Sequence, residues 1–254
     1  MIVVVGLAFE ARIAAGPGLH VICGGNGKNL PATISAAIAD GCRGLLSFGV
    51  AGGLDPALQP GTCVIGSAVL SGKRRMPTDD PWSQRLLQTI PNPVHGTLLG
   101  VPAPIACPDA KRALYLTTGA LAVDMESHVV ASMAAQHGVP MAAIRVITDP
   151  AKRTIPSAAL EAMRPNGTID MLTMIRSLLK KPCELSSLLR TAFDARAARA
   201  TLRRGRQLLG PGLGIPEARN VESGFGATGS LGWRTGGSGP GYALADRRTF
   251  HSAD

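Results

Sequence analysis

The chain has 254 residues, of which 45% are hydrophobic and only 4% aromatic, and its formal net charge is +9. This length suits one α/β domain with extensions, and the core must be built from Val, Ile, Leu and Ala. The five cysteines are scattered and odd in number, which argues against a disulfide framework and a zinc site. With no signal peptide and no long apolar run, the sequence predicts a cytoplasmic protein.

Short apolar runs alternate with segments of helical periodicity through the first 150 residues. Apolar runs without polar alternation indicate strands buried on both faces, and this alternation of elements predicts a three-layer α/β/α sandwich. A polar, proline-interrupted section at residues 72–93 is expected to be loop with one short helix. The predicted strands are residues 2–5, 19–23, 44–48, 62–70, 97–100, 120–124 and 139–147, and the predicted helices are residues 29–41, 82–89, 108–117 and 126–137.

The character of the chain changes after Lys181. Residues 180–209 hold eight basic and two acidic side chains, and thus six of the nine net positive charges, in a segment rich in helix formers. Residues 211–254 contain ten glycines and little that could form a core, which predicts disorder. We therefore expect a catalytic domain at 1–181, a basic helical extension at 182–210 and a glycine-rich tail at 211–254.

Acidic residues follow two of the predicted strands. Asp124 and Glu126 come directly after one strand, and Asp149 ends the next one along the chain. Because open α/β folds bind ligands at the ends of their strands, we expect these carboxylates to share one crevice. The glycine-rich segment Gly49–Gly53 follows another buried run, and its backbone N–H groups are expected to approach a ligand closely.

Four segments, in this order, resemble signatures of the nucleoside phosphorylase and nucleosidase superfamily: Val3–Arg12, Gly49–Leu54, Val123–Ser127 and Thr148–Asp149. The resemblance covers roughly residues 1–210 and implies a phosphorylase-like sandwich with a central mixed sheet, in a homo-oligomer. Three segments look most like the hopanoid-associated phosphorylase branch, which is thought to remove adenine from adenosylhopane: Phe9–Ile13, Ser47–Pro56 and Asp124–His128.

The resemblance assigns roles to the acidic residues. Asp149 matches the general acid that protonates the leaving purine at N7, and burial can raise the pKa of a carboxyl group enough for that task. Glu126 matches the carboxylate that accepts hydrogen bonds from the ribose hydroxyls, with Met125 packed on the sugar. Asp124 is placed in the binding site, although a carboxylate there can instead hydrogen-bond nearby backbone. Arg145 is expected to pair with a strand-end carboxylate.

The residues define the nucleophile of the reaction less clearly than they define the general acid and the ribose contact. Glu10 matches acidic residues that orient an attacking water in hydrolytic relatives, whereas the guanidinium of Arg12 suits phosphate oxygens. A surface Glu–Arg pair is the alternative for both. Val50 stands where many relatives have a serine that could contact phosphate or water. Gly52 and Gly53 are assigned to substrate binding beside it. The sequence favours phosphate slightly over water.

The sequence thus predicts an enzyme that cleaves the N-glycosidic bond of an adenine nucleoside, most specifically adenosylhopane in hopanoid biosynthesis. A methylthioadenosine or adenosylhomocysteine nucleosidase is the enzymatic alternative. A basic nucleic-acid-binding module is the alternative of another class, but the basic segment offers only Phe193 for base stacking. No metal and no cofactor are expected, and phosphate is kept open as a co-substrate.

A lipid-linked nucleoside would have to be reached at a membrane surface. The basic segment carries a short apolar stripe that is interrupted at Arg196, and its arginines would meet anionic headgroups at the inner membrane face. The alternative is a helix packed on the sandwich with its arginines in water. The apolar residues concerned are Leu185, Leu188, Leu189, Ala192 and Phe193.

Overall fold

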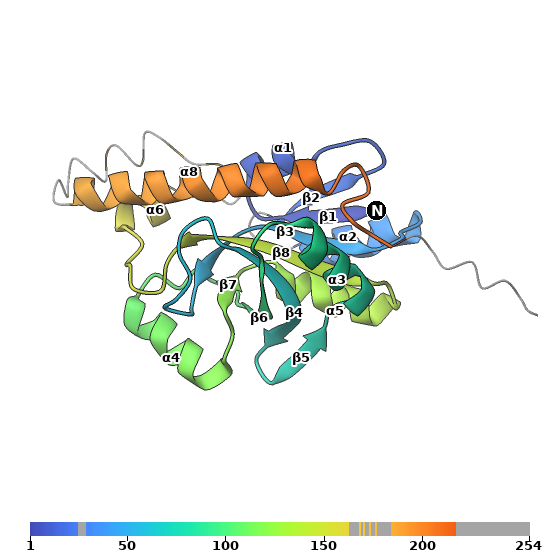
Figure 1. Ribbon diagram of the computed structural model, residues 1–254, viewed down its shortest axis with the longest axis horizontal. Coiled ribbons are helices and arrows are strands. Elements are labelled where there is room, and N and C mark those ends of the chain that lie inside the picture. Colours follow the sequence, from blue (N-terminus) through green and yellow to red (C-terminus); the bar gives the residue numbers. More distant parts are fainter. Residues whose placement is uncertain are drawn as a thin grey trace, which may run out of the picture. The chain divides into compact units, whose positions relative to one another are not determined.

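The computed structural model describes residues 1–24, 29–162 and 184–216, together with residues 168, 170, 173 and 176. The chain divides into two compact units, Met1–Glu217 and Ala218–Asp254, and the second lies outside the described residues. In the first unit, helices flank a mixed sheet of eight strands (Figure 1). The predicted α/β fold with a central mixed sheet is therefore confirmed.

The sheet runs in the order β2-β1-β3-β7-β6-β4-β5, and β8 pairs with both β3 and β4. Consequently β3, β8, β4, β6 and β7 form a closed ring of paired strands. Strands β1, β3 and β8 run parallel, whereas β7 runs antiparallel to β3. The strands are β1 (Ile2–Val5), β2 (His20–Cys23), β3 (Leu45–Gly53), β4 (Cys63–Ser71), β5 (Arg74–Pro77), β6 (Val94–Gly100), β7 (Ala122–Asp124) and β8 (Met141–Asp149).

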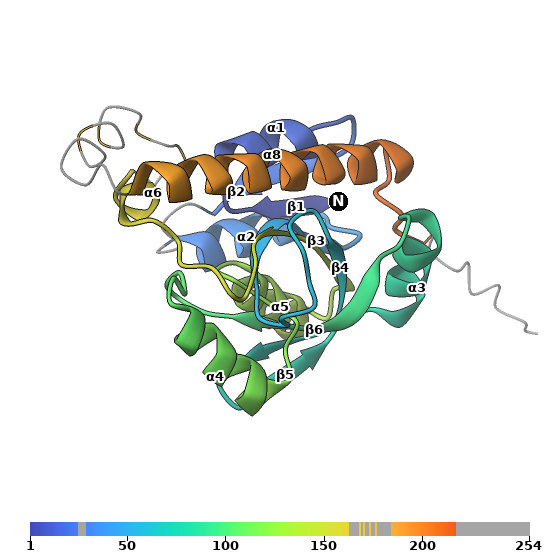
Figure 2. The ribbon, with the colours of Figure 1, turned by 60° about the vertical axis from the view of Figure 1, so that its left-hand side comes forward.

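Helices cover the sheet on both faces, with α2 and α5 packed together on one side and α1 and α8 on the other (Figures 1 and 2). The two faces follow from the alternation of side chains along each strand. In β1, Ile2 and Val4 join the core under α2 and α5, while Val3 and Val5 join the core under α1 and α8. The helices are α1 (Ala8–Ala14), α2 (Leu30–Ala39), α3 (Asp80–Thr89), α4 (Pro108–Thr118), α5 (Ser127–His137), α6 (Ser157–Glu161) and α8 (Leu185–Leu208).

Three local expectations from the sequence were wrong. The segment after β1, for which the sequence predicted neither helix nor strand, is helix α1, because its Ala, Glu, Arg and Phe side chains tolerate a helix well. The section 72–93 contains β5, a short edge strand whose polar residues conceal it. Strand β3 continues through its glycines as far as Gly53, so the predicted glycine-rich loop is the end of a strand.

Residues 185–208 of the predicted basic extension form helix α8, whose second half packs on the sheet in the same unit as residues 1–162. Ala198 and Leu202 are buried in the core beside β8. The start of the predicted disordered tail is also packed, since Leu213 is fully buried and its carbonyl accepts a hydrogen bond from Trp82 Nε1 at 3.0 Å. The rest of that tail, 217–254, lies outside the described residues. Within the described ranges, no helix is long and apolar enough to cross a membrane.

Candidate active site

A fully buried guanidinium lies at the centre of the predicted site. Arg145, in the middle of β8, has no solvent exposure. Its Nη2 contacts Asp124 Oδ1 at 3.0 Å and Glu126 Oε2 at 3.5 Å. The same nitrogen donates to Ser47 Oγ at 2.7 Å and Ser127 Oγ at 3.2 Å. The pairing predicted for Arg145 is confirmed, and it joins β3, β7, β8 and the start of α5.

Asp124 fixes the turn between β7 and α5. Its Oδ1 accepts hydrogen bonds from the backbone N–H of Glu126 at 2.9 Å and of Ser127 at 2.7 Å. The side chain is 1% exposed and pairs with Arg145. Hydrogen bonding to backbone, the alternative weighed for Asp124 from the sequence, is thus what the structure shows. We assign Asp124 to holding Glu126 in place.

Glu10 is buried at the first turn of α1, at the carboxyl end of β1. Its Oε2 accepts hydrogen bonds from the backbone N–H of Gly6 at 2.9 Å and Leu7 at 2.8 Å, and its Oε1 accepts one from Val50 at 2.7 Å. Burial raises the pKa of Glu10, while Arg145 and these backbone donors oppose the rise. A surface Glu–Arg pair is therefore wrong for Glu10, because its carboxylate is inside the site.

Glu126 occupies the N-cap position of α5, and its carboxylate lies close to Gly6, which follows β1. Burial raises its pKa to about 7, Arg145 opposes the rise, and the neighbouring Asp124 and Glu10 add to it. Glu126 is therefore expected to hold a proton for part of the time near neutral pH. The site is consequently rich in negative charge when it is fully ionised.

Three of the four predicted acidic residues, Glu126, Glu10 and Asp149, each lie over a glycine. A Cβ on Gly6 would be 2.6 Å from Glu126 Oε1, a distance that real Cβ atoms do not reach. The glycines therefore make room for carboxylates, and the approach of the Gly49–Gly53 backbone N–H groups to a ligand stays a prediction. The other two pairs are Gly49 with Glu10 Oε1 at 2.6 Å and Gly52 with Asp149 Oδ2 at 2.9 Å.

Asp149 ends β8 and pairs with a buried lysine. Lys111 of α4 has no exposed surface, and its Nζ lies 2.6 Å from Asp149 Oδ2. Burial raises the pKa of Asp149, and the ammonium of Lys111 opposes the rise. A carboxyl group with a raised pKa beside a fixed cation is suited to giving up a proton and to holding the charge that remains.

Only part of this charged assembly reaches solvent. The side chains of Glu126 and Asp149 are 12% and 14% exposed, whereas those of Arg145 and Lys111 are fully buried. These two partly exposed carboxylates are the ones for which the sequence analysis predicted direct contact with the substrate, Asp149 with the base and Glu126 with the ribose. Glu126 pairs with Arg145 of β8, and Asp149 ends the same strand four residues further on.

The remaining predicted residues divide into two groups. Met125 and Val50 are half-buried next to the carboxylates, and Gly53 follows Gly52 in β3, so the structure brings these together. Arg12 is exposed on α1. Because residues two apart in a helix point to opposite sides, Arg12 faces away from the buried Glu10. Its contact with phosphate stays a prediction, without a neighbour from the carboxylate cluster to support it.

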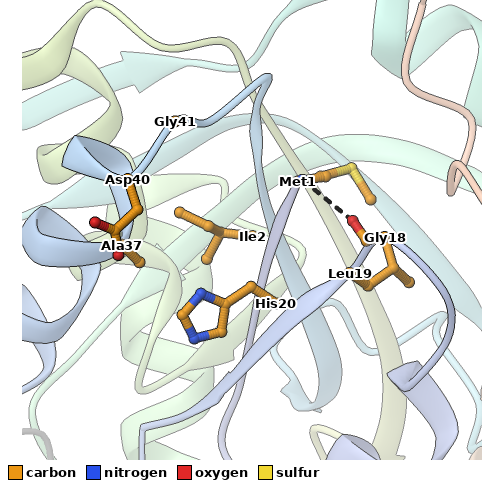
Figure 3. A pocket seen from close by; sticks show the side chains of 8 residues that line it. All are labelled: Met1, Ile2, Gly18, Leu19, His20, Ala37, Asp40 and Gly41. Carbon is orange, nitrogen blue, oxygen red and sulfur yellow. Dashed lines mark hydrogen bonds between the residues drawn. The ribbon is translucent and has the colours of Figure 1, made fainter.

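The pocket in Figure 3 lies elsewhere. It is formed at the amino ends of β1 and β2, beside the end of α2, and its lining includes Met1, His20, Asp40 and Gly41. The carboxylate cluster is at the carboxyl end of β1, so this pocket contains none of the predicted site residues. In the described part of the chain, no group of His, Cys, Asp and Glu side chains is arranged to hold a metal ion.

A family model described as the phosphorylase superfamily matches residues 6–180. The chain belongs to the phosphorylase superfamily. The matched range contains every carboxylate of the cluster, together with Arg145 and Lys111. The match is to the superfamily as a whole and does not single out the hopanoid-associated branch. No curated protein matches the sequence.

Solved structures of similar fold include several nucleosidases. A putative 5′-methylthioadenosine/S-adenosylhomocysteine nucleosidase from Francisella philomiragia is 14% identical with a TM-score of 0.56, covering 82% of this chain and 95% of that one. A putative methylthioadenosine nucleosidase from Weissella paramesenteroides is 17% identical with a TM-score of 0.53, covering 81% and 95%. A futalosine hydrolase mutant from Helicobacter pylori is 16% identical with a TM-score of 0.51, covering 57% and 87%. At these identities the likeness establishes the fold.

Three residues that contact the predicted carboxylates or Arg145 were not predicted from the sequence. Ser47 and Ser127 hydrogen-bond Arg145, and Lys111 pairs with Asp149. The serines were hidden because a single hydroxyl in an apolar strand or at a helix start carries no signature. A signal for Lys111 was present, since the residue lies on the buried side of a predicted helix.

Glu126→Gln is expected to flatten the pH dependence of unfolding. The folded pKa of Glu126 is about 7 and its ordinary value is 4.5. A raised carboxyl pKa contributes stability that is complete below pH 4.5 and is lost as the pH rises through about 7. The loss is at most about 3 kcal/mol. Gln cannot ionise and should abolish this part of the slope.

Urea unfolding of the wild type and the variant at about pH 5 and about pH 8 measures the effect. Glu161→Gln, which alters an exposed glutamate of α6, is the matched control and should keep the wild-type slope. Equal pH dependence in wild type and Glu126→Gln would show that Glu126 is ionised throughout.

Proposed function

We propose that the chain cleaves the N-glycosidic bond of an adenine nucleoside that carries a 5′ substituent, with water as the nucleophile. The observation that carries this proposal is the pair of partly exposed carboxylates, Glu126 and Asp149, of which one pairs with Arg145 of β8 and the other ends the same strand. In the proposed complex the ribose lies against Glu126 and the base against Asp149. Membership in the phosphorylase superfamily supports the reaction class.

In this proposal Asp149 gives its proton to N7 of the base as the C1′–N9 bond breaks and the bonding electrons pass to the base. Glu126 accepts hydrogen bonds from the ribose hydroxyls and stabilises the positive charge that develops on the sugar. Met125, half-buried beside Glu126, supplies an apolar surface for the ribose. The water oxygen then bonds to C1′.

Glu10 is the proposed acceptor of the water proton. A carboxylate has about four lone-pair positions. Backbone donors occupy three of them in Glu10, from Gly6, Leu7 and Val50, and one position is left for a water molecule. The three N–H groups hold the carboxylate in a single orientation, which is what a base needs in order to direct its water.

Water is favoured over phosphate on electrostatic grounds, which revises the slight preference drawn from the sequence. Arg145, the cation at the cluster, already contacts Asp124 and Glu126. Among the residues that the structure describes, a phosphate dianion placed there would face Glu10 and Glu126 without an uncommitted cation, since Arg12 is exposed on the other side of α1. Like charges at this range disfavour binding.

Methylthioadenosine and adenosylhomocysteine are the first candidate substrates. Structural neighbours that cover most of this chain carry those names, although a likeness of this degree extends to the fold alone. The experiment is to incubate the purified chain with each compound, with and without phosphate, in water enriched in ¹⁸O. Adenine and an ¹⁸O-labelled free sugar, formed at a rate independent of phosphate, are expected. A sugar 1-phosphate would overturn hydrolysis, and no adenine from any adenosyl compound would overturn the function.

Adenosylhopane is the second candidate, favoured by the motifs of the first 150 residues and by α8. Leu185, Leu189 and Phe193 of α8 are 47%, 53% and 71% exposed and recur every four residues. They form one stripe among the arginines of the helix, a pattern suited to an anionic membrane surface. In this arrangement the enzyme would be a homo-oligomer that meets its lipid-linked substrate at the inner face of the membrane.

Vesicle flotation tests that contact without removing α8, whose second half is part of the core. The variant Leu189→Glu/Phe193→Glu should release the chain from anionic vesicles, with no binding to neutral ones. Leu116→Glu alters an equally exposed apolar side chain on α4 and is the matched control. Equal flotation of all three proteins would reject docking through α8.

A further inference from the structure

Lys111 occupies an unusual place for a lysine. Its side chain is fully buried within the first turns of α4. Besides the 2.6 Å contact with Asp149 Oδ2, its Nζ lies 3.5 Å from the carbonyl oxygen of Asp149, 3.3 Å from that of Pro150 and 3.4 Å from that of Arg153. A lysine is almost never fully buried unless it is paired. Every contact of this ammonium is with Asp149 or the turn that follows it.

The pairing leaves Asp149 with one oxygen for a ligand. Oδ2 is held by Lys111 and lies over Gly52, where a Cβ would be 2.9 Å away. The side chain as a whole is 14% exposed. Since Lys111 engages Oδ2 alone of the two carboxylate oxygens, the proton that Asp149 would give to a ligand is assigned to Oδ1.

We propose that Lys111 is a positioning residue for Asp149, which orients Oδ1 toward the base and stabilises the carboxylate that remains once the proton has moved. This inference rests on the proposed function. In the step concerned, the O–H bond at Oδ1 breaks and a bond to N7 of the base forms. Lys111 keeps its own protons throughout and supplies the compensating positive charge.

Charges from each neighbouring element act on Asp149. Lys111 comes from α4 and acts at contact distance, while Asp194 of α8 adds a weaker repulsion. Arg153, in the turn after β8, is paired with Asp194. Strands β3 and β7 present Gly52 and Val123, which carry no charge. Lys111 is accordingly the cation that decides the acidity of Asp149, against the effect of burial.

Lys111→Gln is expected to move the alkaline limb of the pH–rate profile upward. A general acid must be protonated, so the rate falls as the pH rises through the pKa of Asp149. Removing a contacting opposite charge raises that pKa, by about 1–3 units. The acid on the plateau becomes weaker, and kcat should fall by about tenfold or more. The acid limb, which depends on Glu10 and Glu126, should stay in place and serves as an internal reference.

The variants separate charge from packing. Gln retains hydrogen bonds to Asp149 and the turn without the charge, and Lys111→Met is a second neutral variant should Gln fail to fold. Lys111→Arg keeps the charge and should hold the limb near its wild-type position. Arg112→Gln, which changes the exposed next residue of α4, should leave the whole profile unchanged.

The titration of Asp149 can also be followed without turnover, by NMR of protein labelled with ¹³C-aspartate. The Asp149 carboxyl signal is identified by its absence in Asp149→Asn. The midpoint of its titration should rise in Lys111→Gln and Lys111→Met and stay in place in Lys111→Arg. An alkaline limb and a carboxyl titration that do not move in either neutral variant would overturn the role of Lys111. A wild-type chain that releases no adenine would instead overturn the proposed function, whatever the titration shows.

Discussion

Asp149→Asn is expected to lower kcat by about 10²–10⁴-fold, the range associated with a general acid. Asn has nearly the shape of Asp and keeps a hydrogen-bond acceptor for Lys111, but it has no proton of suitable acidity to give to the leaving base. Since ground-state contacts with the nucleoside are largely kept, KM should change much less than kcat.

The leaving group provides a sharper readout. A ribosyl compound whose leaving group is p-nitrophenolate departs without protonation, so Asp149→Asn should cleave it nearly as fast as the wild type does. Asp109→Asn, an exposed change on α4, is the control for loss of an aspartate charge. Equal loss of rate on the activated and the natural substrate would place the defect in folding or binding, and the assignment of the acid would fail.

Removing Asp149 also leaves a cation behind. The Lys111 ammonium is fully buried, and without its counter-ion it must lose its charge or be reached by water. Thermal unfolding of Asp149→Asn should therefore accompany the kinetic measurement. A lower Tm with the native circular dichroism spectrum at assay temperature is compatible with the expected result.

The sequence predicted the secondary-structure elements better than the contacts between the candidate site residues. The order of strands and helices follows from apolar periodicity, which is a local property, so most elements from Ile2 to Asp149 were predicted. Acidic residues at strand ends are also visible locally, and the structure brings Glu10 to the same cluster as Asp124 and Glu126. What escaped prediction depends on contacts between residues far apart in the chain.

The glycines of β3 illustrate the difference. Their spacing suggested a loop that approaches a ligand, yet Gly49 and Gly52 lie in a strand and give space to Glu10 and Asp149. A glycine can serve either purpose, and only the position of the opposing side chain decides between them. The same holds for Lys111, whose partner is 38 residues further along the chain.

Arg145→Met should lower the free energy of unfolding by about 3–5 kcal/mol, the usual cost of removing one partner from a buried ion pair. Methionine fills much of the same volume, so the loss arises from charge more than from packing. It leaves Glu10, Asp124 and Glu126 buried together without a cation, since Arg145 is the guanidinium that opposes the rise in the pKa of Glu10 and Glu126.

The loss of unfolding free energy in Arg145→Met should grow as the pH rises. Without Arg145 the folded pKa values of Glu10 and Glu126 rise further, so protonated carboxyls are the stable form. A raised carboxyl pKa gives stability that is lost with rising pH, and the difference from wild type should thus be larger at about pH 8 than at about pH 5. Urea unfolding at both values measures it, and Arg43→Met, an exposed change, is the control.

A second substitution tests whether charge is the cause. Arg145→Met/Asp124→Asn carries one fewer buried carboxylate, while Asn Oδ1 can still accept the backbone N–H groups of Glu126 and Ser127 that Asp124 holds. The double variant should regain part of the stability that Arg145→Met loses at about pH 8, because one fewer carboxylate is then buried without its cation. The effects of the two substitutions should therefore be less than additive. Two results would show that the carboxylates do not depend on Arg145. One is that the effects of the two substitutions on the free energy of unfolding simply add. The other is that the free energy of unfolding of Arg145→Met lies within about 1 kcal/mol of the wild-type value at that pH. Glu126 would then be held for catalysis by its backbone turn alone.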